Sequence, residues 1–273
     1  MGRTPDEEVW RLLAVKDGQG VSGQTHSASD PEIVIVPDPQ ALAVEAARRF
    51  TGLAVQAATD RGRFAVALSG GTTPRMLYRL LAREPYRRAI PWARVHLFWA
   101  DERCVPIADA ESNFHLVSEA LISHVPIPAQ NVHRVPTELG AETAAHAYED
   151  VLFAFLGGPS PQFDLVLLGL GSDGHTASLF PGSSALQETE RLAVAVEAHY
   201  QGRPSQRVTL TLPAINAARQ AIFLVSGSSK ASIVQAVLEG AAGESPASRV
   251  RPTMGPPTWL LDAAAAAHLK SSS

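Results

Sequence analysis

The stretch Phe64-Ala-Val-Ala-Leu-Ser-Gly-Gly-Thr-Thr-Pro74 joins five apolar residues to a glycine-rich turn and then to a proline. A short run that is apolar at every position predicts a strand buried on both faces. Proline suits the first turn of a helix, so the stretch predicts a helix over residues 74–82. Strand, turn and helix in this order are typical of an α/β fold.

The same alternation continues on both sides of this stretch. We expect strands at residues 33–36, 64–68, 95–100, 164–169, 207–212, 221–225 and 258–261. We expect helices at residues 39–58, 74–82, 112–121, 141–156 and 230–238, and an alanine-rich helix capped by Asp262 near the end. Apolar strands that alternate with helices predict an α/β fold, Rossmann-like and doubly wound, with one mostly parallel sheet covered by helices on both faces.

The chain divides into two unequal parts. Residues 17–30 have almost no apolar content, so we expect residues 1–31 to be a polar, mobile N-terminal extension. Residues 32–273 are expected to form a single α/β domain, because 273 residues are ordinary for one such domain. Residues 240–257 are rich in glycine, serine and proline and predict a surface loop.

Composition narrows the classes of function. A net charge of −4 gives no basic stripe, so neither nucleic acid nor an anionic membrane is an expected partner. The single cysteine, Cys104, permits no intrachain disulfide, which fits a reducing compartment. No apolar run has the length of a signal peptide core or a transmembrane helix, so we expect a cytoplasmic protein, with a monomer as the default state.

In a doubly wound sheet the ligand lies outside the carboxyl ends of the strands, so the loops that follow strands carry the chemistry. The loop after residues 64–68 holds Ser69, Gly70, Gly71, Thr72 and Thr73. Close backbone amides, hydroxyl groups and the positive end of a helix suit a phosphate. The alternative is a plain glycine-rich turn with a threonine cap, and the Gly-Lys-Ser/Thr of a Walker A loop is missing.

A second loop follows the strand at residues 95–100. It carries Asp101 and Arg103, which we expect to face the ligand in the crevice at the end of the sheet. Arg103 could hold a phosphate or polarise a carbonyl, because its planar guanidinium suits oxyanions. Asp101 could bind sugar hydroxyls or orient another group. The alternative is a solvated cluster of salt bridges.

The most informative loop lies at residues 168–182. Four glycines, at positions 169, 171, 174 and 182, surround Asp173 and His175. A histidine with a pKa near 6.5 suits proton transfer near neutral pH, and ester or lactone hydrolysis needs such a base together with donors for an oxyanion. The alternative is a structural histidine in a turn. Asp101, Asp173 and His175 lack metal-ligand spacing, so no metal site is predicted.

Taken together, these loops resemble those of the 6-phosphogluconolactonases in the sugar-phosphate isomerase and lactonase superfamily. The matching stretches are residues 68–74, 95–103 with Ser112-Asn113, and 169–181, with further matches at residues 207–211, 227–230, 246–247 and 259–262. The resemblance covers about residues 32 to 268, and the order and spacing of the stretches make it specific.

The resemblance implies a sugar-phosphate isomerase type of fold and hydrolysis of 6-phospho-D-glucono-1,5-lactone to 6-phosphogluconate in the oxidative pentose phosphate pathway. No metal and no cofactor are implied, and the expected partner is the small sugar-phosphate lactone. By motif match His175 is the general base, with Asp173 and Asp101 beside it as catalytic residues. The substrate-binding residues implied are Ser69, Gly70, Gly71, Thr72, Thr73, Arg103, Asn113, Gly171, Arg207 and Lys230.

Two other functions stay open at this point. Glucosamine-6-phosphate deaminases share the scaffold, but they look like Asp-Glu-Tyr where this chain has Asp101-Glu-Arg103, and they carry a further Glu after Asp-Gly-His. A sugar-phosphate sensor without catalysis would need a DNA-binding module, and residues 1–31 are too short and too polar for a helix-turn-helix. A serine nucleophile is disfavoured because no Gly-x-Ser-x-Gly occurs.

Overall fold

The computed structural model describes residues 31–157, 162–240, 243 and 245–270. The predicted N-terminal extension lies, except for Pro31, outside the described residues, so its separation from the domain stays a prediction.

The centre of the structure is a six-stranded sheet in the order β1-β9-β8-β5-β2-β3, with every neighbouring pair parallel. Its strands are β1 (Glu32–Val36), β2 (Phe64–Leu68), β3 (Val95–Trp99), β5 (Leu165–Leu168), β8 (Ala221–Val225) and β9 (Thr258–Asp262). Strands β2, β5, β8 and β9 are buried at every position, as expected for a parallel sheet covered on both faces.

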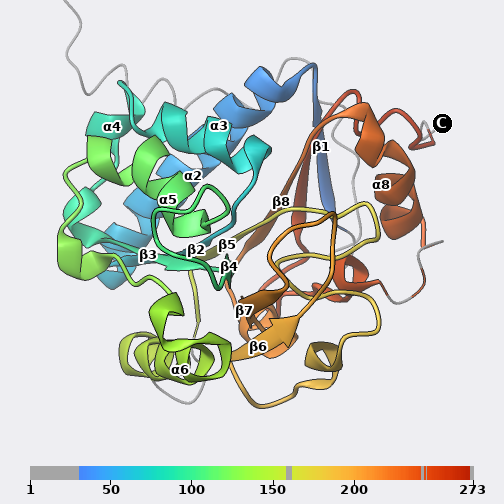
Figure 1. Cartoon of the computed structure of the whole chain (residues 1–273). Helices are drawn as coiled ribbons and strands as arrows, with labels where there is room; N and C mark the ends of the chain where they lie inside the picture. The colour runs from blue at the N-terminus through green and yellow to red at the C-terminus, as the bar shows by residue number, and fades with distance from the viewer. Residues whose placement is uncertain (1–30, 158–161, 241–242, 244, 271–273) are drawn as a thin grey trace, which may run out of the picture.

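Helices surround this sheet, and the prediction of a doubly wound α/β fold is confirmed. They are α2 (Pro39–Arg61), α3 (Thr72–Leu81), α4 (Tyr86–Ala89), α5 (Asn113–Ala120), α6 (Ala141–Leu156), α7 (Leu212–Asn216) and α8 (Ala231–Leu238). In Figure 1, α2 to α5 gather on one side of the molecule and α8 on the other, while α6 lies beside β6 and β7. No helix in the described part of the chain is long and apolar enough to cross a membrane.

A second, antiparallel sheet was not expected. It has the order β4-β7-β6, with β4 at Asp101–Arg103, β6 at Ala193–Glu197 and β7 at Gln206–Leu210. The loop predicted after residues 95–100 is therefore partly a strand. Three charged residues in a row show no alternation of apolar and polar positions, so the sequence did not predict this strand. Strand β7 was predicted, but it pairs with β4 and β6 and not with the parallel sheet.

The predicted alanine-rich helix after residue 262 is wrong. Asp262 does cap a turn, since its carboxylate accepts the Ala265 N–H at 2.7 Å and its carbonyl accepts the Ala266 N–H at 3.0 Å. The bonds that follow do not continue this pattern, because the Leu269 N–H returns only three residues, to the Ala266 carbonyl. The segment forms turns, because a helix this short is marginal even when rich in alanine.

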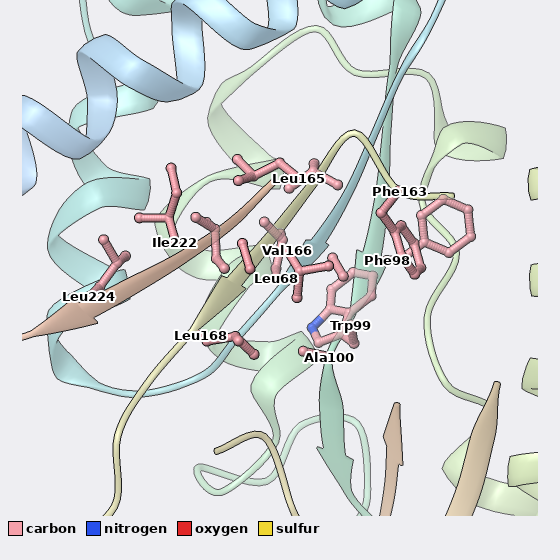
Figure 2. Packing of buried hydrophobic residues seen from close by; sticks show 14 of the residues in the cluster. Leu68, Phe98, Trp99, Ala100, Phe163, Leu165, Val166, Leu168, Ile222 and Leu224 are labelled. Atoms are coloured by element: carbon pink, nitrogen blue, oxygen red, sulfur yellow. The ribbon is translucent and has the colours of Figure 1, made fainter. Parts of the chain in front are cut away.

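The core holds the carboxyl ends of the central strands rigidly in place. Figure 2 shows Leu68, Trp99 and Leu168, from the ends of β2, β3 and β5, packed among other buried side chains. The Tyr148 hydroxyl accepts the Trp99 N–H at 2.7 Å and donates to its carbonyl at 3.0 Å, and the Tyr78 hydroxyl donates to the Ser69 carbonyl at 2.7 Å. The loops that leave β2 and β3 therefore start from fixed points.

Candidate active site

A pocket of about 480 Å³ opens at the carboxyl ends of β2, β5 and β8, beside β4. The chain runs from β2 outward to β3 and then returns to β5 on the other side of β2, so β2 and β5 flank the point where strand order reverses. All three loops predicted to carry chemistry meet here. The predicted residues that line the pocket are Ser69, Gly70, Gly71, Thr72, Thr73, Asp101, Arg103, Asn113, Gly171, His175, Arg207 and Lys230.

His175 and Asp173 form a hydrogen-bonded pair at the pocket. His175 Nδ1 lies 2.6 Å from Asp173 Oδ1, and the His175 backbone N–H donates to the same oxygen at 3.1 Å. A carboxylate oxygen accepts only, so the proton of a neutral imidazole resides on Nδ1 and the lone pair on Nε2. The Nε2 atom is therefore the basic atom of this pair.

Burial keeps this imidazole uncharged. Burial lowers the pKa of His175 below its ordinary value of 6.5, although Asp173 and Asp101 act to raise that pKa. Lys230 lowers it further through its positive charge. The His175 side chain, 14% exposed, is thus neutral near pH 7, the state that a general base requires.

Gly171 provides the space for this pair. A Cβ atom at position 171 would overlap His175 Nδ1 and Cε1 and would lie 2.6 Å from Asp173 Oδ1. The Gly171 N–H donates to the His175 carbonyl at 2.8 Å, so this amide already has a partner. The contribution of Gly171 is room for the histidine ring, and a role for its amide in binding an oxyanion is not supported.

The loop after β2 leads directly into α3. Helix α3 begins at Thr72, two residues before the expected start, so Thr72 and Thr73 present first-turn N–H groups that have no partner within the helix. Thr73 Oγ1 also lies 2.7 Å from Ser226 Oγ, at the end of β8. A helix end facing a pocket that also holds Lys230 suits a phosphate group.

Asp101 lies at the floor of the pocket and organises its neighbours. The carboxylate is 6% exposed and accepts the Ser178 hydroxyl at 2.7 Å and the Asn113 side-chain amide at 3.3 Å. The Ser178 oxygen in turn accepts a bond from Arg207 at 3.5 Å. Asp101 has no hydrogen bond to His175 among the described contacts, so its position fits an orienting role.

Arg103 and Asn113 are held by Glu102, which sequence reasoning did not single out. The buried Glu102 carboxylate accepts the N–H groups of Arg103, Asn113 and Phe114 at 2.6 to 2.8 Å, and this fixes the start of α5. Burial raises the pKa of Glu102 to about 7, although these hydrogen bonds act to lower it. Arg103 also donates to the Glu111 carbonyl at 2.6 Å.

Other residues of the pocket were missed because they carry no motif. Tyr200, Gln201 and Arg203 come from the turn between β6 and β7, and Ser226 follows β8. Only the tertiary structure brings them to the pocket. Among the residues that the structure describes, no three His, Cys, Asp or Glu side chains are grouped to hold a metal ion.

Comparison with known proteins places the chain in a family. Residues 37–259 match the family model described as glucosamine-6-phosphate isomerases/6-phosphogluconolactonase. A 6-phosphogluconolactonase of Synechocystis is 39% identical over 246 residues, covering 88% of this chain and 99% of the relative. That of Rattus norvegicus is 45% identical over 210 residues, with 76% and 81% covered. The structure of 6-phosphogluconolactonase from Trypanosoma cruzi superimposes with a TM-score of 0.81 at 31% identity, covering 91% and 100%.

Proposed function

The chain belongs to the glucosamine-6-phosphate isomerase/6-phosphogluconolactonase family, and we propose that it hydrolyses 6-phospho-D-glucono-1,5-lactone with His175 as the base that activates water. This reaction is a step of the oxidative pentose phosphate pathway. The observation that supports the proposed base most strongly is the His175–Asp173 pair, whose basic Nε2 belongs to a neutral imidazole at the wall of a cationic pocket.

The first chemical step is attack of water on the lactone carbonyl carbon. His175 Nε2 takes the proton of the water as its oxygen bonds to that carbon, and the Asp173 carboxylate stabilises the imidazolium that forms. The carbonyl oxygen becomes an oxyanion. The intermediate then collapses as the bond from carbon to ring oxygen breaks. The imidazolium returns its proton to the ring oxygen, which leaves as a hydroxyl group, and the new carboxylic acid then loses its proton to solvent.

The cationic side chains bind the phosphate and stabilise the oxyanion. Lys230 and the first turn of α3 bind the phosphate, because both place donors and positive charge at one side of the pocket. The buried Arg207 and the partly buried Arg103 also line the pocket and stabilise the oxyanion or the hydroxyl groups of the sugar. Asp101 holds the Asn113 side chain at the pocket, and through the buried Ser178 hydroxyl it is linked to Arg207.

We also propose that the enzyme acts as a cytoplasmic monomer and needs no metal or cofactor. The single cysteine supports the reducing compartment. The proposed mechanism is complete with the side chains of the pocket, since proton transfer and charge stabilisation are the only demands of lactone hydrolysis.

The test is direct assay of the purified protein. The lactone is generated in situ from glucose 6-phosphate by its dehydrogenase, because it opens spontaneously, and formation of 6-phosphogluconate is followed. We expect hydrolysis well above the spontaneous rate and no ammonia from glucosamine 6-phosphate. Ammonia release, or tight binding of sugar phosphates without turnover, would contradict the proposal and favour the deaminase or the sensor.

A further inference from the structure

The turn between β6 and β7 is a defined hairpin tip that reaches the pocket. The Arg203 N–H donates to the Tyr200 carbonyl at 3.0 Å, which closes a four-residue turn. Its two central residues, Gln201 and Gly202, have φ of 51° and 67°. Positive φ at both positions is what a type I′ hairpin turn requires. Tyr200 is therefore the first residue of a tight turn.

This hairpin is anchored to the strand that carries other pocket residues. Strand β7 pairs with β6 on one side and with β4, which holds Asp101 and Arg103, on the other. The pairing of β6 with β7 runs out to Glu197 and Gln206, and the Ala198 N–H then donates to the Ser205 carbonyl at 2.9 Å, two residues before Tyr200. The position of Tyr200 is consequently set by the same framework that sets the floor of the pocket.

Tyr200 packs against the proposed base. Its ring meets the His175 ring edge to face, with centroids 4.7 Å apart and an angle of 80°. Phe180 contacts the imidazole as well, at 4.3 Å, and the two aromatic rings lie 5.7 Å from each other. The Tyr200 hydroxyl lies 3.0 Å from Ser172 Oγ, beside Asp173 in the chain, which ties the tip to the histidine loop.

We propose that Tyr200 is a positioning residue for the base: its ring holds the His175 imidazole in the orientation that keeps Nδ1 on Asp173 and points Nε2 at the lactone. The bond from Nδ1 to Asp173 fixes one atom of the imidazole but leaves the ring free to turn about that bond. Contacts with Tyr200 and Phe180 remove this freedom. The inference rests on the proposed function, because it assigns an orientation needed for lactone attack.

The Tyr200 ring also keeps water from the imidazole. The charged groups that act on His175 are Asp173 and Asp101, which raise its pKa, and Lys230, which lowers it. Arg207 lies over the Phe180 ring, 5.5 Å from its centroid. Burial is the largest cause of the lowered pKa, so removal of the Tyr200 ring should let the pKa of His175 rise. As the pH is lowered, activity would then be lost at a higher pH than in the wild type, because the protonated ring cannot act as a base.

The test compares Y200A and Y200F with a matched control on the same hairpin, H199A. The His199 side chain is 85% exposed, lies 3.8 Å from Glu197 at the end of β6, and is not among the residues that line the pocket. We expect Y200A to lower kcat roughly 10- to 100-fold with a smaller change in KM, because the base loses its orientation. Its acid limb should move to higher pH. Y200F, which keeps the ring, should stay within about threefold of wild type, as should H199A.

A second measurement needs no substrate. The ring of His175 is titrated by NMR in the wild type and in Y200A, and we expect a higher pKa in the variant. Unchanged kcat together with an unchanged titration in a folded Y200A would overturn the inference. So would a Y200F variant as impaired as Y200A, since the hydroxyl would then carry the effect. If the wild type fails to hydrolyse the lactone while the titration shifts as expected, the function fails and the packing role stands.

Discussion

Substitution of Gly171 by alanine adds one methyl group at the point where the site has no room for it. The added Cβ would lie 2.6 Å from Asp173 Oδ1, about 0.8 Å short of ordinary van der Waals contact at 3.4 Å, and closer still to Nδ1 and Cε1 of His175. The two side chains are hydrogen-bonded to each other at 2.6 Å, so neither can move aside without disturbing that bond. The ring and the carboxylate must therefore move by on the order of 1 Å.

A displacement of this size has a predictable effect on rate. Misplacement of a catalytic group by about 1 Å costs roughly 100-fold, so we expect G171A to lower kcat about 100-fold and to change KM little. Lactone hydrolysis is measured under saturating substrate, and a thermal melt verifies that the variant is folded. The matched control is H199A, because that side chain is 85% exposed and is not among the residues that line the pocket, so kcat should stay within about threefold. Wild-type kcat in a folded G171A would refute the argument that this pair must keep its geometry.

Three further predictions follow from the same contacts. Asp173→Asn should lower kcat on the order of 100-fold and KM much less, because the imidazolium loses its carboxylate partner; an unchanged kcat would remove Asp173 from the mechanism. The acid limb of kcat/KM should fall below pH 6.5, since burial lowers the pKa of His175 and activity disappears only as pH drops through it; a limb at higher pH would contradict this. Glu102→Gln should lower the free energy of unfolding at pH 8 by about 1–3 kcal/mol in urea denaturation, because the new NH₂ group leaves an N–H such as that of Phe114 without an acceptor; equal stability would show that α5 does not need this cap.

The parallel sheet was predictable because its pattern is local. Runs such as Phe64–Leu68 and Ala221–Val225 are apolar at every position, and both are followed by a helix whose apolar face is read from nearby residues. The second sheet was not predictable, because β4 has three charged residues whose partner strand lies about a hundred residues away. The alternation of residue types in β7 predicted a strand, but it does not indicate which sheet the strand joins.

In the proposed site, too, local features were predictable from the sequence and long-range contacts were not. Residues within one loop, such as Asp173 and His175, were found because glycines mark the loop and both groups can titrate. The surroundings that hold them came only from the structure. Tyr200 lies 25 residues after His175 on a hairpin tip without a motif, and Glu102 looked like a solvated charge although it is 2% exposed. Long-range packing of this kind leaves no spacing in the sequence.

Lactone hydrolysis by His175→Ala beside the wild type tests the central claim most directly. The lactone is generated in situ, the spontaneous opening is subtracted, and the fold of both proteins is verified by circular dichroism. A general base contributes roughly 100- to 10,000-fold, so we predict that the variant loses at least two decades of kcat. A folded His175→Ala variant that hydrolyses the lactone at the wild-type rate would contradict the assignment of His175 as the base.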